Sequence, residues 1–288
     1  MKQFSRRQLL QGGVVAGAMS VAAPFVRAQK EQKILQFVAE ADLKVFDPVW
    51  TTGYITRNHS YLVYDTLFGT DETLQIRPQM VDRTTVSNDG MKYTFTLRDG
   101  LAWHDGQPVV SEDCVESLKR WSKRDRFGQL LMAHTKKLAS IDLRSFGLEL
   151  AERFGLVFES LSGLRGPFMM PARIAATPAE EQIKEFIGSG PFMFARDEWQ
   201  PGHQVVYLRN PAYVPRDEPP SGSSGGKKAY LDKVVWHYMP DPWDAADGLA
   251  AGEFDWWQEP PIEFIPKIER HPELQTFVID PHERGHSR

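Results

Sequence analysis

Hydrophobic and polar residues in the first hundred positions follow the spacing of short strands and helices. Ile34 to Val38 is an apolar run of strand length, and Asp47-Pro48 breaks regular structure soon after it. From Ser60 to Phe68 the apolar residues are spaced as on one face of a helix. Met91 to Arg98 alternates between apolar and polar residues, which predicts a half-buried strand.

Turn and helix signals fill the next stretch. Asp99-Gly100 and Asp105-Gly106 are turn dipeptides, so the residues between them are predicted to make a hairpin-like excursion. Ser111 is positioned to cap a helix whose apolar face includes Cys114 and Trp121. Because no base is evident beside Cys114, we interpret it as a small core residue rather than a reactive thiol.

The second half of the chain continues this mixture. Gly188 to Pro191 has the composition of a sharp turn, and residues 219–228, rich in Ser, Gly and Pro, have that of a flexible loop. The other predicted elements are strands at 192–194, 204–208 and 234–239, a short helix at 245–251 and an extended segment at 254–257. Mixed strands and helices predict α/β lobes but do not specify a function.

The N-terminus has the features of a twin-arginine export leader. Arg6 and Arg7 precede a weakly apolar stretch from Gly12 to Ala23, shorter than the roughly 20 residues that a membrane-spanning helix needs. Small residues at the positions that a signal peptidase reads predict cleavage after Ala28. We therefore expect residues 1–28 to be a leader, and the folded protein to reach the periplasm by the twin-arginine route. An ordinary secretory leader or a retained anchor is the alternative.

Charge and cysteine content exclude several classes of protein. Residues 1–28 hold four of the 34 Lys and Arg residues and none of the 38 Asp and Glu residues, so the remaining chain has 30 against 38 and a formal net charge of −8. This balance argues against nucleic acid, whose phosphates require a basic surface. Since Cys114 is the only cysteine, we expect no internal disulfide and no cysteine-based zinc site.

Three arrangements of residues could suggest an enzyme. His282 to His286 fits H-E-x-x-H, in which two histidines of a helix bind zinc, but a proline precedes the motif and a glycine weakens it. Glu253 with Asp255, and His104 with Asp105, are explained by turns. We therefore predict no catalytic residue, no metal and no required cofactor. A periplasmic hydrolase is kept as the least favoured alternative.

The chain carries a series of short turn, cap and strand motifs in a particular order. They are Phe46-Asp47-Pro48, Tyr93 to Gly100, Trp103 to Val109, Ser111 to Val115, Gly188 to Phe192, Arg209 to Tyr213, Leu231 to Val234 and Gly252 to Asp255. Each is weak evidence alone, but the ordered set resembles the family 5 extracellular solute-binding proteins, the dipeptide- and oligopeptide-binding group. We interpret these residues as fold markers rather than solute contacts.

The resemblance implies a fold and a division into domains. Members of this family have a large first lobe, a subdomain inserted into it, and a second lobe, with the solute between the two lobes. By resemblance we expect an α/β, type II periplasmic-binding-protein-like first lobe in residues 29–68 and 186–275, with an α+β subdomain inserted at 69–185. We expect the second lobe to be missing, because residues 276–288 depart from the family pattern. A frameshift or a premature stop is our hypothesis for this divergent tail.

The resemblance also implies a binding site. Thr52, Gly53 and Tyr54 are the expected backbone edge for an extended solute, since relatives offer main-chain hydrogen bonds at this point. The candidate cleft walls, which would enclose the solute, are Trp50, Trp256 and Trp257. For each of these tryptophans, packing in the core is an equally good interpretation.

The role that the resemblance implies is capture of a small solute, a peptide in the first instance. The partners would be the permease subunits of an ABC importer in the inner membrane. Relatives also carry nickel complexes, opines and sugars, so the resemblance does not name the solute. Because burial of a small ligand needs an enclosed cleft, the alternative is a remnant lobe that folds but binds no solute.

Overall fold

The structure, a computed structural model, describes residues 32–162 and 166–277. The predicted leader, with Arg6, Arg7 and the cleavage point after Ala28, lies outside the described residues, and so does the H-E-x-x-H segment at 282–286. Within the described ranges, no helix is both long enough and apolar enough to cross a membrane.

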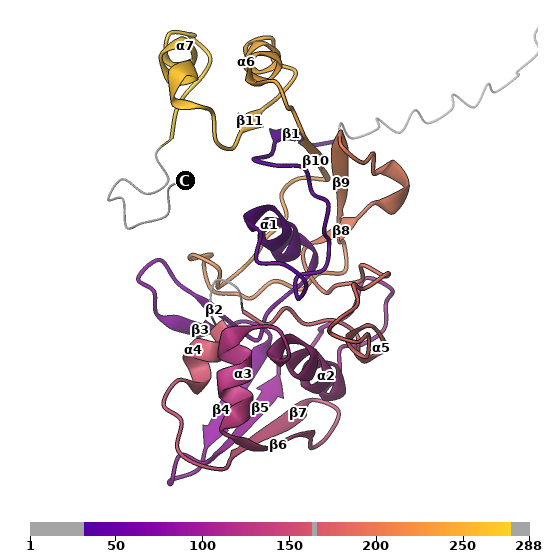
Figure 1. Ribbon diagram of the computed structural model, residues 1–288, viewed down its shortest axis with the longest axis vertical. Coiled ribbons are helices and arrows are strands. Elements are labelled where there is room, and N and C mark those ends of the chain that lie inside the picture. Colours follow the sequence, from indigo (N-terminus) through magenta and orange to yellow (C-terminus); the bar gives the residue numbers. More distant parts are fainter. Residues whose placement is uncertain (1–31, 163–165, 278–288) are drawn as a thin grey trace, which may run out of the picture. The chain divides into compact units, whose positions relative to one another are not determined.

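A five-stranded mixed sheet joins early and late segments of the chain (Figure 1). In spatial order its strands are β11 (Trp256–Trp257), β1 (Ile34–Val38), β10 (Lys233–His237), β9 (Gln204–Arg209) and β8 (Phe192–Phe194). β1 pairs in parallel with β10 and β11, whereas β10, β9 and β8 are successively antiparallel. Since a parallel pair requires a crossover, the long segment between β1 and β10 folds elsewhere before the chain returns.

Short helices accompany this sheet, and its core is rich in aromatic rings. Tyr64 and Tyr207 are fully buried in that core, next to Phe46 and Trp236. A smaller apolar cluster around Leu249 lies among the helices that follow β10. These helical segments are α1 (Tyr54–Val63), α5 (Ala172–Ala175), η1 (Arg196–Glu198), α6 (Pro242–Ala250), η2 (Ile262–Phe264) and α7 (Ile265–Glu269).

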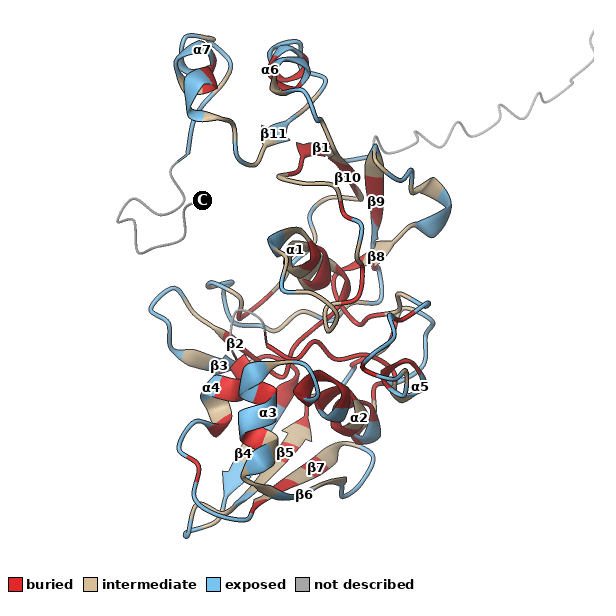
Figure 2. Cartoon of the chain, viewed as in Figure 1, coloured by how far each residue is buried: buried red, intermediate tan, exposed pale blue. Residues whose placement is uncertain are grey.

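The segment between α1 and α5 forms an antiparallel sheet with its own core. The sheet has the order β4 (Val81–Val86), β5 (Lys92–Leu97), β7 (Ser145–Leu150) and β6 (Thr135–Ser140). Beside it are the hairpin of β2 (Phe68–Thr70) and β3 (Ile76–Pro78) and the helices α2 (Ser111–Ser122), α3 (Arg126–Ala133) and α4 (Val157–Ser162). Phe95 of β5 and Phe146 of β7 are fully buried, with ring centroids 5.1 Å apart. Figure 2 shows α2 largely buried.

Most elements predicted from hydrophobic spacing are confirmed. β1, β5 and the β8–β9 hairpin occupy the predicted segments, and α6 begins three residues before the expected start. The turns before Ser111 are also present, because Gly100 and Gly106 both have positive φ angles. Cys114 is fully buried in the apolar core, and burial raises the pKa of its thiol above the usual range.

The helix predicted from Ser60 to Phe68 is wrong at both ends. α1 begins at Tyr54 and ends at Val63, and Phe68 starts β2. Every residue from Tyr64 to Phe68 is buried, because this extended stretch passes from one core to the other. The apolar spacing there reflected burial against two cores rather than one face of a helix.

The predicted cap of α2 is also wrong. The N-cap residue is Val110, and its backbone N–H donates to the Asp113 carboxylate at 2.9 Å. The Ser111 hydroxyl instead donates to the backbone carbonyl of Asp142, at the turn between β6 and β7. Asp113 also accepts the indole N–H of Trp103 at 3.0 Å. An acidic side chain in the first turn therefore performs the role that we expected of the serine.

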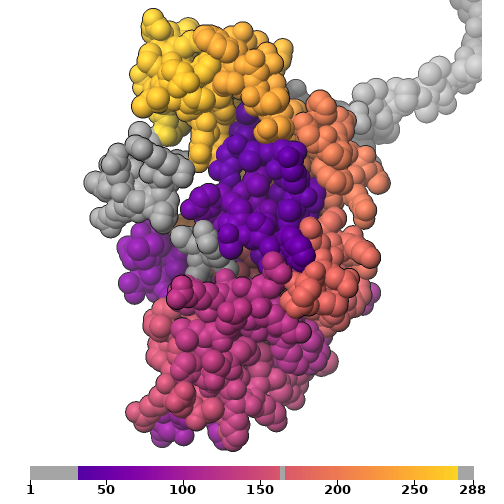
Figure 3. Space-filling model, in the orientation of Figure 1, coloured from indigo at the N-terminus to yellow at the C-terminus, as the bar shows by residue number. Residues whose placement is uncertain are grey.

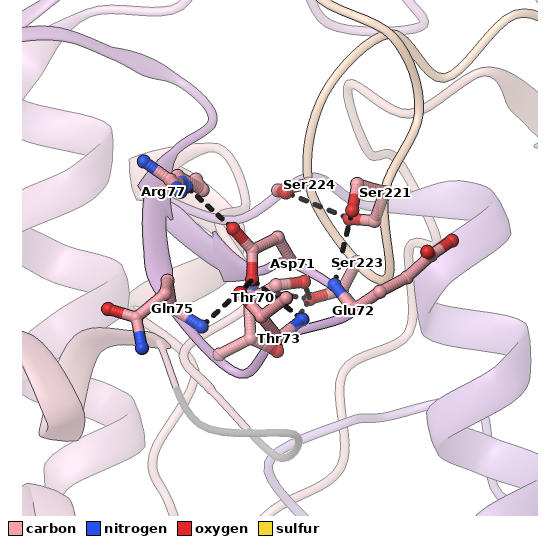
Figure 4. A network of polar contacts seen from close by, with 9 residues as sticks. All are labelled: Thr70, Asp71, Glu72, Thr73, Gln75, Arg77, Ser221, Ser223 and Ser224. Carbon is pink, nitrogen blue, oxygen red and sulfur yellow. Dashed lines mark hydrogen bonds and ion pairs between the residues drawn. The ribbon is translucent and has the colours of Figure 1, made fainter.

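The Ser- and Gly-rich segment at 219–228 is a loop, as predicted, and it is anchored to the β2–β3 hairpin (Figure 4). The Ser223 hydroxyl accepts the backbone N–H of Thr70 at 2.9 Å, and the Ser221 hydroxyl accepts that of Glu72 at 3.1 Å. Gly222 has φ +55°, and a Cβ there would come within 2.4 Å of the Thr70 carbonyl oxygen. The small residues permit this close approach, whereas composition suggested only flexibility.

The tip of the hairpin is organised by one carboxylate. Asp71 accepts hydrogen bonds from the backbone and hydroxyl of Thr73, the backbone N–H of Gln75 and the Arg77 guanidinium (Figure 4). These bonds, led by those from the Thr73 hydroxyl and Arg77, hold the pKa of the Asp71 carboxyl well below its usual range.

The turn before β8 packs directly on the end of α1. A Cβ at Gly188 would lie 1.9 Å from the carbonyl oxygen of Val63. We predict that Gly188→Ala lowers the free energy of unfolding by about 1–3 kcal/mol, because the backbone must shift to relieve this overlap. Urea denaturation measures the change. Gly155→Ala is the control, since a Cβ at Gly155 meets nothing within 4 Å; equal stabilities of the two variants would contradict the prediction.

Candidate functional site

A pocket of about 640 Å³ lies between the loop that follows β1 and the helices of the antiparallel-sheet region. One wall is formed by residues from Pro48 to Arg57, and the other by the end of α2, the start of α3 and part of α4. Figure 3 shows the indigo residues of the loop and α1 next to the magenta residues of this helical region. A second hollow, of about 780 Å³, lies beside the β2–β3 hairpin and contains none of the predicted site residues.

The loop is anchored by a buried ion pair. The carboxylate of Asp47 accepts hydrogen bonds from the Arg120 guanidinium, at 3.0 Å from Nη1 and 2.7 Å from Nη2, and each side chain is 1% exposed. Asp47 also accepts two backbone N–H groups, and Arg120 donates to two backbone carbonyls. Because a buried pair requires its other polar groups to be satisfied, this network holds the start of the loop against α2.

Two aromatic rings on the pocket wall, Trp50 of the loop and Tyr54 of α1, each form a cation–π contact with an arginine. The guanidinium of Arg124 lies 4.5 Å from the centroid of the Trp50 ring and donates to two backbone carbonyls, one of them that of Trp50. The guanidinium of Arg57 lies 4.4 Å from the centroid of the Tyr54 ring. Cation–π contacts of this kind are attractive and keep the arginine in place. They leave its charge without a carboxylate partner.

Positive charge is in excess on the pocket wall. Arg57, Arg124 and Arg126 all line the pocket, and in the described ranges the ion pairs involve other cationic residues. Two acidic residues also line it. The carboxylate of Asp125 is occupied in capping α3, where it accepts two backbone N–H groups, and Glu159 is exposed.

The charge of Arg57 also affects the pKa of a carboxyl just after β1. Burial raises the pKa of the Glu40 carboxyl, and the nearby Glu259 raises it further, while Arg57 opposes both effects. Arg57 therefore favours the ionised form of Glu40, but burial and Glu259 outweigh it.

The structure brings together three of the six predicted solute contacts. Trp50, Thr52 and Tyr54 line the pocket. Gly53 is the N-cap residue of α1 and Tyr54 is the first residue of that helix. The Gly53 carbonyl accepts the backbone N–H of Arg57 at 3.0 Å, so this carbonyl is used within the helix. Main-chain binding of a solute by Thr52, Gly53 and Tyr54 stays a prediction.

The other two tryptophans lie elsewhere. Trp256 and Trp257 form β11 at the edge of the five-stranded sheet, and neither lines the 640 Å³ pocket. Trp256 is 50% exposed and packs edge-on against Phe37, with centroids 5.4 Å apart. Trp257 packs against Phe264 at 5.7 Å. Contact of either residue with a solute stays a prediction.

Sequence reasoning missed the arginines and placed Trp121 only in the core. Arg57 follows Tyr54 by three residues, so their neighbourhood on one helical face could have been found from spacing. The contact between Arg124 and Trp50 joins residues 74 positions apart and has no local signal. Trp121 is 4% exposed, as expected for a core residue, and it also forms part of the pocket wall.

The fold defines an α/β lobe of the type II periplasmic-binding-protein class. The chain resembles the solved structure of the Helicobacter pylori periplasmic binding protein DppA in complex with the peptide STSA, with a TM-score of 0.68 and 23% identity, over 84% of this chain and 50% of that one. It resembles AgaA of A. tumefaciens R10 in complex with agropinic acid equally, with a TM-score of 0.68 and 23% identity, over 83% of this chain and 46% of that one. These likenesses concern the fold.

The chain belongs to the bacterial extracellular solute-binding proteins, family 5, which match residues 75–286. It is 43% identical to a probable peptide ABC transporter periplasmic-binding protein, y4tO, of Sinorhizobium fredii, over 96% of this chain and 53% of the relative. The chain thus spans about half the length of the curated relatives that it matches.

Proposed function

We propose that this chain acts as the solute-binding component of an ABC importer and captures peptides or similar small solutes in the periplasm. The main support is the 43% identity, along 96% of the chain, to a protein described as a probable peptide ABC transporter periplasmic-binding protein. A pocket lined by Trp50, Thr52 and Tyr54 is consistent with a binding role. The partners in this proposal are the permease subunits of the importer, and export follows the twin-arginine route through Arg6 and Arg7.

The proposal includes the division into domains. Lobe one comprises residues 29–68 and 186–275, and the inserted subdomain comprises 69–185. Two separate apolar cores, one beside each larger sheet, support two bodies. The core of the five-stranded sheet also includes residues from Phe168 to Ile183, which lie within 69–185. In a complete binding protein, two lobes close over the solute by a hinge motion and present it to the permease.

The second candidate is that the residues of this chain fold but do not bind solute by themselves. The observation that favours it is the length of the relatives, since this chain spans 53% of the most similar one named above. A solute that is held between two lobes loses contacts when only one lobe is present.

Thermal unfolding in the presence of di- and oligopeptides tests the proposal. A ligand that binds only the folded state, at about 100 times its Kd, adds about 2.7 kcal/mol to the free energy of unfolding. For a chain of this size, that corresponds to a rise in Tm of roughly 5–10 °C. No shift for any peptide, from a chain that melts cooperatively, would favour the second candidate.

Two variants locate the binding. Thr52→Trp places a large side chain in the 640 Å³ pocket and should abolish the shift, because Thr52 is an exposed residue on its wall. Trp256→Ala removes an exposed ring outside that pocket. If the shift survives Thr52→Trp and disappears in Trp256→Ala, the solute binds at β11 instead.

A further inference from the structure

We propose that the 640 Å³ pocket takes an anionic group of the solute, a carboxylate, with Arg126 and Arg57 as its binding residues. The inference rests on the proposed function and names the chemical group of the solute that the pocket binds. It concerns residues of α1 and α3, and none of the motifs that mark the family includes residues of these two helices.

Three arginines that have no ion pair among the described residues gather at this pocket. Six other arginines in the described ranges form ion pairs with carboxylates, and the remaining arginines there do not line the pocket. Such ion pairs are formed by Arg77, Arg120, Arg144, Arg173, Arg209 and Arg216. In the described part of the chain, Arg57, Arg124 and Arg126 form none, and all three line one pocket. The chain has a formal net charge of −4, so a surplus of carboxylates was available to pair with them.

The three arginines have many unused hydrogen-bond donors. A guanidinium carries five N–H donors. Arg124 uses two of them on backbone carbonyls, and Arg57 uses one on the side-chain oxygen of Asn58. Arg126 is exposed and has no hydrogen bond among those that the described residues form. Most of the donors therefore remain available to a ligand at the pocket wall.

Two of the three guanidinium groups are preorganised. Arg57 is stacked on Tyr54 and Arg124 on Trp50, so both guanidinium groups have a defined place without being neutralised. A stacked guanidinium keeps its N–H edge free for bidentate binding of a carboxylate. Arg124 adds a third positive charge to the pocket wall. Its own hydrogen bonds go to two backbone carbonyls, one of them in the loop. Three like charges around one hollow repel one another, and Asp125 and Glu159 on the same wall offset them only in part. An anion between the arginines therefore lowers the repulsion further.

The test compares three peptide probes by calorimetry on the full chain. They are Ala-Ala-Ala, its C-terminal amide, and the amide of Ala-Glu-Ala. We expect the Kd of Ala-Ala-Ala to be at least tenfold lower than that of its amide, because only the free acid has a terminal carboxylate to pair with the arginines. Tight binding of the Ala-Glu-Ala amide would show that a side-chain carboxylate also enters the pocket.

Arg126→Gln assigns the effect to the pocket. This variant should raise the Kd of Ala-Ala-Ala about tenfold and leave the Kd of its amide unchanged. Arg57→Gln should act in the same direction, and it provides a second variant if the first fails to fold. Arg153→Gln, which removes an exposed arginine outside the pocket, should leave both affinities unchanged.

The possible results with the three probes test the carboxylate assignment and peptide capture separately. If the acid and the amide bind equally well, or if Arg126→Gln weakens both alike, the carboxylate assignment is overturned and peptide capture stands. If none of the three probes binds to a folded chain, peptide capture itself fails, and the carboxylate assignment fails with it.

Discussion

Arg120→Met is expected to lower the free energy of unfolding by about 3–5 kcal/mol, because it leaves the Asp47 carboxylate buried without its partner. Asp47 and Arg120 are each 1% exposed in their side chains, and their closest N–O distance is 2.7 Å. Water therefore cannot replace the lost hydrogen bonds. Urea denaturation at neutral pH measures the loss.

Lys119→Met is the matched control for this substitution. Lys119 is next to Arg120 on α2, and its ion pair with Glu116 is on the surface, where the Lys119 side chain is 47% exposed. An exposed pair of this kind contributes about 0–1 kcal/mol. Similar losses in the two variants would show that burial does not determine the strength of the Asp47–Arg120 pair.

Stability should also fall steeply as the pH drops below about 6.5. His59 is fully buried on α1, and burial lowers its pKa from 6.5 to about 3. Below pH 6.5 the unfolded chain binds a proton at this residue while the folded chain does not, so the lost stability grows as the pH falls towards 3. The expected slope from His59 is about 1.4 kcal/mol per pH unit. Urea denaturation between pH 7 and pH 4 measures it.

A second histidine, His104, adds to the same dependence of stability on pH. Burial lowers the pKa of His104 to about 4, although its hydrogen bond to the Gly190 carbonyl and the charge of Asp105 oppose the shift. Nδ1 of His104 accepts the backbone N–H of Gly188 at 3.3 Å while Nε2 donates to the Gly190 carbonyl. Protonation of Nδ1 would break the hydrogen bond from the backbone N–H of Gly188. The contact between His104 and the turn before β8 therefore also requires a neutral ring.

His59→Gln isolates the first contribution. Glutamine does not titrate and retains an acceptor for the Tyr207 hydroxyl, which lies 2.9 Å from Nδ1 of His59. The variant should lose about 1.4 kcal/mol per pH unit of the dependence between pH 6 and pH 4. His203→Gln removes an exposed histidine as the control. An unchanged slope in His59→Gln would show that His59 is already protonated in the folded protein at pH 4.

Elements whose signals lie close together in the sequence were predictable. The alternation of β5, the apolar run of β1 and the Gly-containing turns are patterns that can be recognised within a single strand or turn. Prediction failed at 64–68, where burial comes from two cores, and at Ser111, where the acceptor is the carbonyl of Asp142. In both cases the partner lies far along the chain.

The candidate site shows the same division. The sequence by itself determined the family, most elements and the region of Trp50 to Tyr54, because these depend on local order and composition. Only the tertiary structure decided that Tyr54 begins a helix and that Arg124 covers Trp50. It also decided that Trp256 and Trp257 lie outside the pocket. The physical reason is that a pocket is a property of side chains from separate segments, and their meeting depends on packing that no single segment encodes.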